Sequence, residues 1–266
     1  MHLKRLRKII VIGMLFYLPF TSCAWSLTGH RIVGEIADSY LTKKSRKAIA
    51  DILGKESVAM SANWMDFIKS DPSYSYLYNW HFINLSAGLS EPDIESYLAI
   101  DTATDAYTKI NFCIAQLKSR SALSLENKQL YLRVLIHVIG DIHQPMHTGH
   151  FEDLGGNKIK VLWFSIPTNL HSVWDDKLIE SQDLSYTEYT TAINYTNKQQ
   201  RREWQAETIS KWVTDSYNIA QKLYGDITMP DQKLDYKYNF KYLDILNHQL
   251  LKAGVHLAGV LNDIFD

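Results

Sequence analysis

Apolar side chains recur at helical spacing, every third or fourth residue, along most of the chain. The pattern predicts helices over residues 30–41, 43–53, 103–120, 125–143, 201–224 and 242–264. Gly54 follows the second of these stretches and Pro145 follows the fourth, and both residue types end helices. We therefore expect a mainly α-helical protein.

One segment between the central and the C-terminal helices has a different pattern. Residues 154–171 read LGGNKIKVLWFSIPTNLH, in which a glycine pair precedes β-branched and aromatic residues. This composition is typical of strands joined by turns, and it predicts a short β-hairpin at most. The chain has no internal repeat and no linker, and about 240 residues can bury one sizeable core. Residues 25–266 are thus expected to form a single compact domain.

The first 24 residues have the organisation of a secretory signal peptide. Four basic residues precede an apolar stretch over 9–20, and Ser22-Cys23-Ala24 supplies the small residues of a cleavage site. The apolar stretch is shorter than the roughly 20 residues that span a bilayer. We expect cleavage between Ala24 and Trp25, and a secreted or periplasmic protein without stable membrane association. An uncleaved anchor and lipidation at Cys23 are the alternatives.

Cleavage would change both the charge and the cysteine content. Of 28 Lys and Arg residues the four in the signal would be lost, which leaves 24 against 29 Asp and Glu, a formal net charge of −5. Such a chain lacks the basic surface that binds nucleic acid through phosphate contacts alone, so positive charge for a phosphate would have to come from metal. Only Cys113 would remain, and one cysteine forms no internal disulfide.

Histidine and aspartate recur at helical spacing in two places. In HVIGDIHQPMH, His137 and Asp141 share one helix face, and His147 follows on a loop that can turn toward the same point. In NLHSVWD, His171 and Asp175 repeat the spacing of four residues. A single pair could equally be a hydrogen bond along a helix. Two pairs with an additional histidine between them indicate a metal site.

Further candidate ligands lie outside these pairs. NWMDFIK contains Asp66, YNWHFIN contains His81, and His30 lies five residues after Trp25, whereas His143 is expected to face elsewhere as a core or supporting residue. The aromatic residues around His81 could be core or could stack a nucleic-acid base. Five histidines and three aspartates suit zinc or a similar ion and exceed the needs of one ion. Bridged ions would activate water and neutralise a phosphate, as phosphate-ester hydrolysis requires.

In combination these segments resemble the S1/P1 nuclease family of secreted, zinc-dependent, single-strand nucleases. The similarity runs in order over nearly all of residues 25–266, through W-x4-H, NWMD, WHFIN, HVIGDIHQPMH, GGN and NLHSVWD. It implies a phospholipase C/P1 nuclease-like fold and three zinc ions per chain. It also implies hydrolysis of single-stranded DNA and RNA to 5′-phosphorylated products, with 3′-nucleotidase activity and no protein partner.

The resemblance further implies a role for individual residues. The first zinc would bind Asp66, His81, His137 and Asp141, the second Trp25, His30 and Asp141, and the third His147, His171 and Asp175. Trp25 would bind through its free amine and carbonyl oxygen, so signal cleavage would complete the site. Asp66 would also contact the attacking water, Lys69 would contact the phosphate, and Phe82 would stack the base.

Two departures and two alternatives accompany this resemblance. Asn84 stands where fungal members have an acidic residue, which leaves base preference open, and the missing disulfides indicate a bacterial-type member. A bacterial zinc phospholipase C shares the fold and a leading Trp, but the short gap from Trp25 to His30 and the final Asp175 favour the nuclease. A zinc-sequestering protein without activity is the other alternative, although no candidate ligand is missing.

Overall fold

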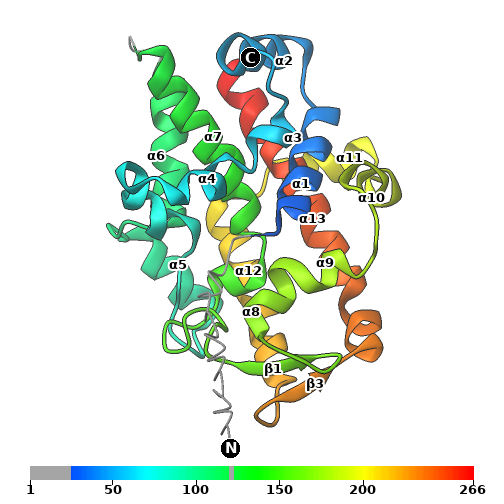
Figure 1. Ribbon diagram of the computed structural model, residues 1–266. Coiled ribbons are helices and arrows are strands. Elements are labelled where there is room, and N and C mark those ends of the chain that lie inside the picture. Colours follow the sequence, from blue (N-terminus) through cyan, green and yellow to red (C-terminus); the bar gives the residue numbers. More distant parts are fainter. Residues whose placement is uncertain (1–24, 120–122) are drawn as a thin grey trace, which may run out of the picture.

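The computed structural model describes residues 25–119 and 123–266, and it confirms the mainly α-helical prediction (Figure 1). The predicted signal peptide, residues 1–24, lies outside the described residues, as does the last residue of the helix predicted over 103–120. The helices are α1 (Leu27–Ser39), α2 (Lys43–Leu53), α3 (Val58–Ser61), α4 (Trp64–Phe67), α5 (Glu91–Ala99), α6 (Ala106–Lys118), α7 (Leu125–Asp141), α8 (Leu170–Ser172), α9 (Leu178–Glu180), α10 (Tyr186–Ile193), α11 (Lys198–Gln205), α12 (Ile209–Gly225) and α13 (Tyr236–Phe265). Short 3₁₀ segments are η1 (Ile68–Ser70), η2 (Pro72–His81) and η3 (Pro145–Thr148), and η4 (Val173–Lys177) is π-helical.

Four of the predicted helices form, three of them with small shifts at their ends. Helix α1 begins three residues early at Leu27, because the side chain of Ser26 caps it by accepting a hydrogen bond from the Gly29 amide. Helix α2 has its predicted bounds, and the chain leaves it through Gly54 at φ 70°. Asp105 caps α6, and α7 ends at Asp141. Capping side chains therefore set boundaries that apolar periodicity alone misplaces.

The two C-terminal predictions need correction. The single helix predicted over 201–224 is wrong, because the chain forms α11 and then α12 with a break between them. Thr208 lies in that break, and its hydroxyl accepts the Lys211 amide as the cap of α12. The last helix, predicted over 242–264, starts earlier at Tyr236, where Asp235 caps it.

The predicted hairpin forms and gains a third strand. Strand β1 (Lys160–Trp163) pairs antiparallel with β2 (Ile166–Asn169), with Lys160 opposite Asn169. Strand β3 (Gln232–Leu234), from a segment between α12 and α13, pairs parallel with β1 on its other edge. Figure 1 shows this small sheet at the end of the molecule opposite α2. The helix that carries the NLHSVWD motif starts directly from β2.

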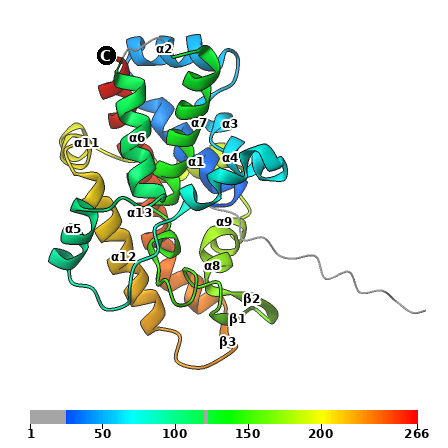
Figure 2. The ribbon, with the colours of Figure 1, turned by 90° about the vertical axis from the view of Figure 1, so that its left-hand side faces the viewer.

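The core is built around contact between the first and the last helix. Helix α13 runs through the molecule, and α1 lies against it (Figures 1 and 2). The approach is so close that a Cβ atom on Gly254 would lie 2.4 Å from Cγ2 of Ile36. Although α13 is 30 residues long, none of the helices in the described part of the chain is both long and apolar enough to cross a membrane.

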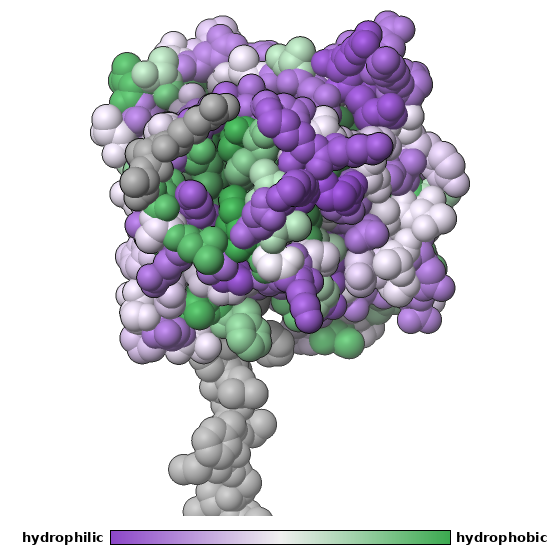
Figure 3. Space-filling view, turned by 90° about the horizontal axis from the view of Figure 1, so that it is seen from above, coloured by the Kyte–Doolittle hydropathy of each residue, from purple (hydrophilic) through white to green (hydrophobic). Residues whose placement is uncertain are grey.

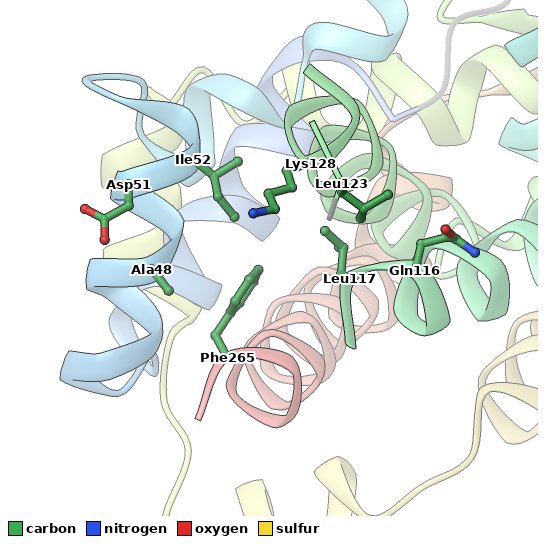
Figure 4. Close-up of a pocket in the computed structure, with 8 residues that line it drawn as sticks. All are labelled: Ala48, Asp51, Ile52, Gln116, Leu117, Leu123, Lys128 and Phe265. Atoms are coloured by element: carbon green, nitrogen blue, oxygen red, sulfur yellow. The ribbon is translucent and has the colours of Figure 1, made fainter. Parts of the chain in front are cut away.

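A hollow of about 350 Å³ opens at the end of the molecule where α2, α6, α7 and the C-terminus of α13 meet (Figures 3 and 4). Its walls are mostly apolar, as the hydropathy colours show, and Lys128 points into it. The lining residues are Ala48, Asp51, Ile52, Gln116, Leu117, Leu123, Lys128 and Phe265. None of them is a candidate ligand, so the candidate chemistry lies elsewhere.

Candidate metal centre

The fold brings together all eight histidine and aspartate side chains predicted as ligands. They come from α1, α4, η2, α7, η3, α8 and η4, which approach one another between the α2 end and the sheet end of the molecule (Figure 1). Their side chains are between 0 and 8% exposed. The eight residues are His30, Asp66, His81, His137, Asp141, His147, His171 and Asp175.

Within this cluster, three groups of side chains have potential ligand atoms within 4.8 Å of one another. The groups are His30, His137 and Asp141; Asp66, His81 and His137; and His147, His171 and Asp175. The last group is the predicted third set. The first two share His137 and contain every side chain of the predicted first and second sets apart from Trp25. The division of ligands between individual ions stays a prediction.

Backbone carbonyl groups fix the orientation of three of the imidazole rings. The Nδ1–H groups of His137, His147 and His171 donate hydrogen bonds of 2.6, 2.7 and 2.6 Å to the carbonyl oxygens of Ala62, His81 and Gly155, respectively. Each bond places a proton on Nδ1 and directs Nε2 toward a carboxylate. This is the arrangement by which proteins orient metal-binding histidines.

Asp141 lies at the centre of the cluster. Its Oδ2 atom is 3.0 Å from Nδ1 of His81 and 3.1 Å from Nε2 of His137. Its Oδ1 atom is 3.3 Å from Nε2 of His30 and 3.7 Å from Nδ1 of His147. Because its two oxygens face different histidines, Asp141 would be able to contribute a ligand atom to each of two ions.

Several buried polar atoms of the cluster make no hydrogen bond to other protein atoms. They are Nδ1 and Nε2 of His30, Oδ2 of Asp66, Nε2 of His81, Oδ1 of Asp141 and Nε2 of His147. Buried nitrogen and oxygen atoms without partners are costly and rarely occur in such a concentration. Metal ions would satisfy most of them, and a donor set of imidazole nitrogen and carboxylate oxygen without sulfur suits zinc. The residues present therefore fit the implied metal.

Charge within the cluster is distributed unevenly. Burial would raise the pKa of Asp141, yet the facing His137 and His147 hold it well below its usual value. Burial lowers the pKa of His81 to about 4. Burial also disfavours a charged His147, but Asp141 and Asp175 raise its pKa to about 9. The ionised Asp141 and Asp175 thus favour a protonated His147, and a metal ion that binds this histidine would have to displace the proton.

The residues predicted to contact substrate lie at the edge of this cluster. Lys69 Nζ donates to Oδ1 of Asp66 at 2.6 Å, and its side chain is 26% exposed. Phe82 and Asn84 are half-buried. Asn84 lines a hollow of about 320 Å³ with other residues that include Tyr97 and Phe151. The structure places Lys69 in contact with a candidate ligand, and Phe82 and Asn84 follow the ligand His81 along the chain. Their roles toward substrate stay predictions.

Trp25, the first described residue, is fully buried beside two ligand segments. Its indole Nε1–H donates to the carbonyl oxygen of Gly140 at 2.7 Å. The amide of the next residue, Ser26, donates to the carbonyl oxygen of Asp175 at 2.6 Å. These bonds connect the start of the described chain to Gly140 in HVIGDIHQPMH and to Asp175 in NLHSVWD.

Sequence reasoning missed three residues that support the cluster. The Gln144 amide donates to Oδ1 of Asp175, and its Oε1 accepts the Met146 amide at 2.5 Å. A Cβ atom on Gly140 would lie 3.0 Å from Nδ1 of His30. Gly155 supplies the carbonyl oxygen that fixes His171. The available sequence signals are the glutamine three residues after Asp141 and the glycine pair of GGN, which by itself indicates only a turn.

His143 faces away from the cluster, as expected from its spacing. Its Nδ1–H donates to the carbonyl oxygen of Ile139 at 2.7 Å, and its Nε2 lies 2.7 Å from Nδ1 of His256 on α13. Both rings are buried. His143 therefore anchors the end of α7 to the last helix rather than adding a ligand.

Comparison with known proteins bears directly on this centre. A sequence model of the S1/P1 Nuclease family matches residues 25–266. Endonuclease 3 of Arabidopsis thaliana is 29% identical over 97% of this chain and 94% of its own length. Nuclease P1 of Penicillium citrinum is 28% identical over 90% of this chain and 97% of its own, and Nuclease S1 of Aspergillus oryzae is 31% identical over 61% of this chain. The family match covers every candidate ligand.

Proposed function

The chain belongs to the S1/P1 nuclease family, and from this premise we propose that it is a secreted zinc nuclease with three ions per chain. It hydrolyses phosphodiester bonds of single-stranded DNA and RNA to 5′-phosphorylated products and removes the phosphate of 3′-nucleotides. The observation that carries the proposal is the buried cluster of three His and Asp groups around Asp141. Its nitrogen and oxygen donors suit zinc, and the mature chain otherwise has an excess of acidic residues.

The side chains at the cluster have complementary roles in this proposal. Bound zinc would supply positive charge for the phosphate and acidify a water molecule. Asp66 accepts a proton or orients the water through the oxygen that makes no hydrogen bond within the protein. Lys69, bonded to the other oxygen of Asp66, directs its ammonium group toward the phosphate. The two groups share one helical turn, so water and phosphate are positioned together.

Recognition of the nucleotide belongs to Phe82 and Asn84. A half-buried phenyl ring offers a face on which an unpaired base can stack, and base stacking is sequence-tolerant. The Asn84 amide carries a donor and an acceptor for a base edge. A base in a duplex is already stacked and paired, which is why the proposal specifies single strands.

Secretion and assembly of the centre are linked in the proposal. Cleavage between Ala24 and Trp25 would create a free amine on a residue that is already buried next to Gly140. That amine and the Trp25 carbonyl oxygen would complete the ligand set of His30 and Asp141. A chain with a retained signal would lack this ligand.

The test combines native mass spectrometry with hydrolysis assays. The mature protein should begin at Trp25 and carry three zinc ions, and it should cleave single-stranded DNA, RNA and a 3′-nucleotide. Phosphatidylcholine, the substrate of the phospholipase C alternative, should remain intact. Hydrolysis of phosphatidylcholine without nucleic-acid cleavage would refute the proposal, as would a protein that binds zinc without hydrolysing any of these substrates.

A further inference from the structure

We propose that Tyr224 on α12 is a positioning residue for the metal group formed by His147, His171 and Asp175. The inference rests on the metal centre of the proposed function. Tyr224 contacts none of these three side chains directly. It acts through the turn that supplies the Gly155 carbonyl oxygen to His171.

The orientation of His171 depends on that turn. Its Nδ1–H donates to Gly155 at 2.6 Å, which directs its Nε2 toward Oδ2 of Asp175 at 3.1 Å. Leu154, Gly155 and Gly156 all have left-handed backbone conformations, with φ of 58°, 60° and 81°. A Cβ atom on Gly155 would lie 2.3 Å from the carbonyl oxygen of Met146. The two glycines adopt this region without strain, whereas Leu154 does so at a cost that contacts with neighbouring structure must offset.

Asp153 and Tyr224 provide such contacts. Oδ1 of Asp153 accepts the Gly156 amide at 2.5 Å and the Tyr224 hydroxyl at 2.8 Å. The Tyr224 oxygen in turn accepts the amide of His150 at 3.0 Å, and the His150 carbonyl accepts the Gly155 amide at 2.9 Å. One hydroxyl thus connects both sides of the turn. Through these bonds it restricts the position of the Gly155 carbonyl group.

The hydroxyl is itself held in place. The Tyr224 ring stacks on the imidazole of His150 with centroids 3.9 Å apart and planes 10° apart. His150 Nε2 lies 2.9 Å from Oε1 of Gln221, on the preceding turn of α12. Burial raises the pKa of Tyr224, so the hydroxyl remains a donor at any ordinary pH. A Cβ atom on Gly149 would lie 2.7 Å from the Tyr224 oxygen, which shows how closely the loop packs on it.

The same helix offers a matched control. Tyr217, two turns earlier on α12, donates through its hydroxyl to the carbonyl oxygen of Ser86 at 2.8 Å and accepts the amide of Leu89 at 3.0 Å. It fixes a loop in the way that Tyr224 does, but no candidate ligand lies in residues 86–89. Tyr217→Phe therefore removes the same atom from the same helix without loosening His171.

The experiment follows zinc loss from the intact protein. The zinc-bound wild type, Tyr224→Phe and Tyr217→Phe are titrated with a competing chelator, and the ions per chain are counted by native mass spectrometry. Tyr224→Phe should release one ion at a 10- to 100-fold lower chelator concentration than the wild type, the effect usual for groups that orient a metal ligand. The remaining ions and all ions of Tyr217→Phe should leave as in the wild type.

Two further variants make the result decisive. His171→Ala should lose the same ion, and adding Tyr224→Phe to it should cause no further loss if the tyrosine acts through His171. Asp153→Ala removes the acceptor of the Tyr224 hydrogen bond and should cause the same selective release of one ion. This variant tests the inference even if Tyr224→Phe fails to fold. Equal release curves for wild type, Tyr224→Phe and Asp153→Ala would overturn the inference alone. A wild type that binds no zinc would overturn the proposed function with it.

Discussion

The imidazole rings of His30 and His137 stack with their centroids 3.8 Å apart and their planes 21° apart. Two protonated imidazoles would repel each other strongly at this distance. Burial lowers the pKa of His30, whereas Asp141 and Asp66 raise the pKa of His137 against the effect of its own burial. At most one ring of the pair is therefore protonated to the charged imidazolium form. Two neutral rings facing carboxylates are the state in which imidazoles bind a metal.

Removal of metal should cost both activity and stability. Without ions the centre keeps buried carboxylates and imidazoles with unsatisfied atoms, so the folded state loses the free energy of binding. That loss is about 4 kcal/mol for each site when the free zinc concentration is 1,000 times the dissociation constant of that site. Thermal unfolding with and without a chelator measures it, and added zinc should restore the melting temperature. An unchanged melting temperature in chelator would show that the ions do not support the fold.

Asp66→Asn should abolish hydrolysis and preserve the fold. The amide keeps the shape of the side chain but loses the charge that faces His30, His137 and Lys69. We expect kcat/KM to fall by more than about 100-fold. Mutation of a residue that only orients a metal ligand already lowers metal affinity or activity 10- to 100-fold. Asp71→Asn is the control, since Asp71 is exposed and bonds Ser73. Full activity of Asp66→Asn in a folded protein would exclude Asp66 from the reaction.

Lys69→Met should lower kcat/KM by roughly 100-fold, the cost of removing one preorganised group that stabilises developing charge. The melting temperature of the zinc-bound protein should change little, because the metal and the nearby His30 and His137 would still compensate the charge of Asp66. Lys47→Met removes a comparable lysine from an exposed pair with Asp51 and should have no effect on hydrolysis. Steady-state kinetics on a short single-stranded substrate compares the three proteins. Equal losses in both variants would point to net charge rather than to the position of Lys69.

Gly254→Ala should destabilise the contact between α1 and α13. The new methyl group would lie 2.4 Å from Cγ2 of Ile36 and 3.0 Å from the Val33 carbonyl oxygen, so the helices must separate. Overpacking of this kind costs about 1–3 kcal/mol. Gly225→Ala, at the end of α12, meets no atom within 4 Å and should stabilise by up to about 1 kcal/mol. Urea unfolding distinguishes the opposite signs, and a neutral Gly254→Ala would contradict the close packing.

Glu207 should contribute stability that disappears in acid. Burial opposes its ionisation, but hydrogen bonds with His256 and Lys252 prevail and lower its pKa from 4.5 to about 2. A carboxyl with a lowered folded-state pKa stabilises above pH 4.5, and the contribution is lost as the pH falls through about 2. Allowing for partial solvent screening, the contribution is of the order of 2 kcal/mol.

Comparison of Glu207→Gln with the wild type isolates this contribution. In metal-depleted protein, the difference in unfolding free energy should be present at pH 6 and should shrink toward zero near pH 2. The exposed Glu203, which accepts a hydrogen bond from Gln199, provides the control through Glu203→Gln. A difference that does not change with pH would mean that packing, rather than charge, accounts for the effect of Glu207→Gln.

Local spacing predicted the parts of the centre that lie on one element. His137 and Asp141 share a helix face, and this spacing brings the two side chains within reach, with Nε2 of the first 3.1 Å from Oδ2 of the second. His81 and Asp66 reach the same point only because separate elements pack together. Their assignment depended on the family resemblance, since no local pattern encodes such distances.

Other features had no usable sequence signal. Strand β3 has three residues, so its apolar pattern is too short to detect, and its partner β1 lies far away in the sequence, with Val161 opposite Gln232. The break between α11 and α12 depends on one capping threonine within a helix-favouring run. Gly155 and Tyr224 come together only through the tertiary structure, and neither residue type identifies the other in the sequence.

The hydrogen bond between Trp25 and Gly140 joins residues 115 positions apart. During synthesis Trp25 emerges long before α7, and the segment of His171 and Asp175 emerges later still. A chain translated only as far as α7 therefore lacks His147, His171 and Asp175, and its centre is incomplete. Under the proposed function, a nuclease built in this order stays inactive while its chain is close to the nucleic acid of its own cell.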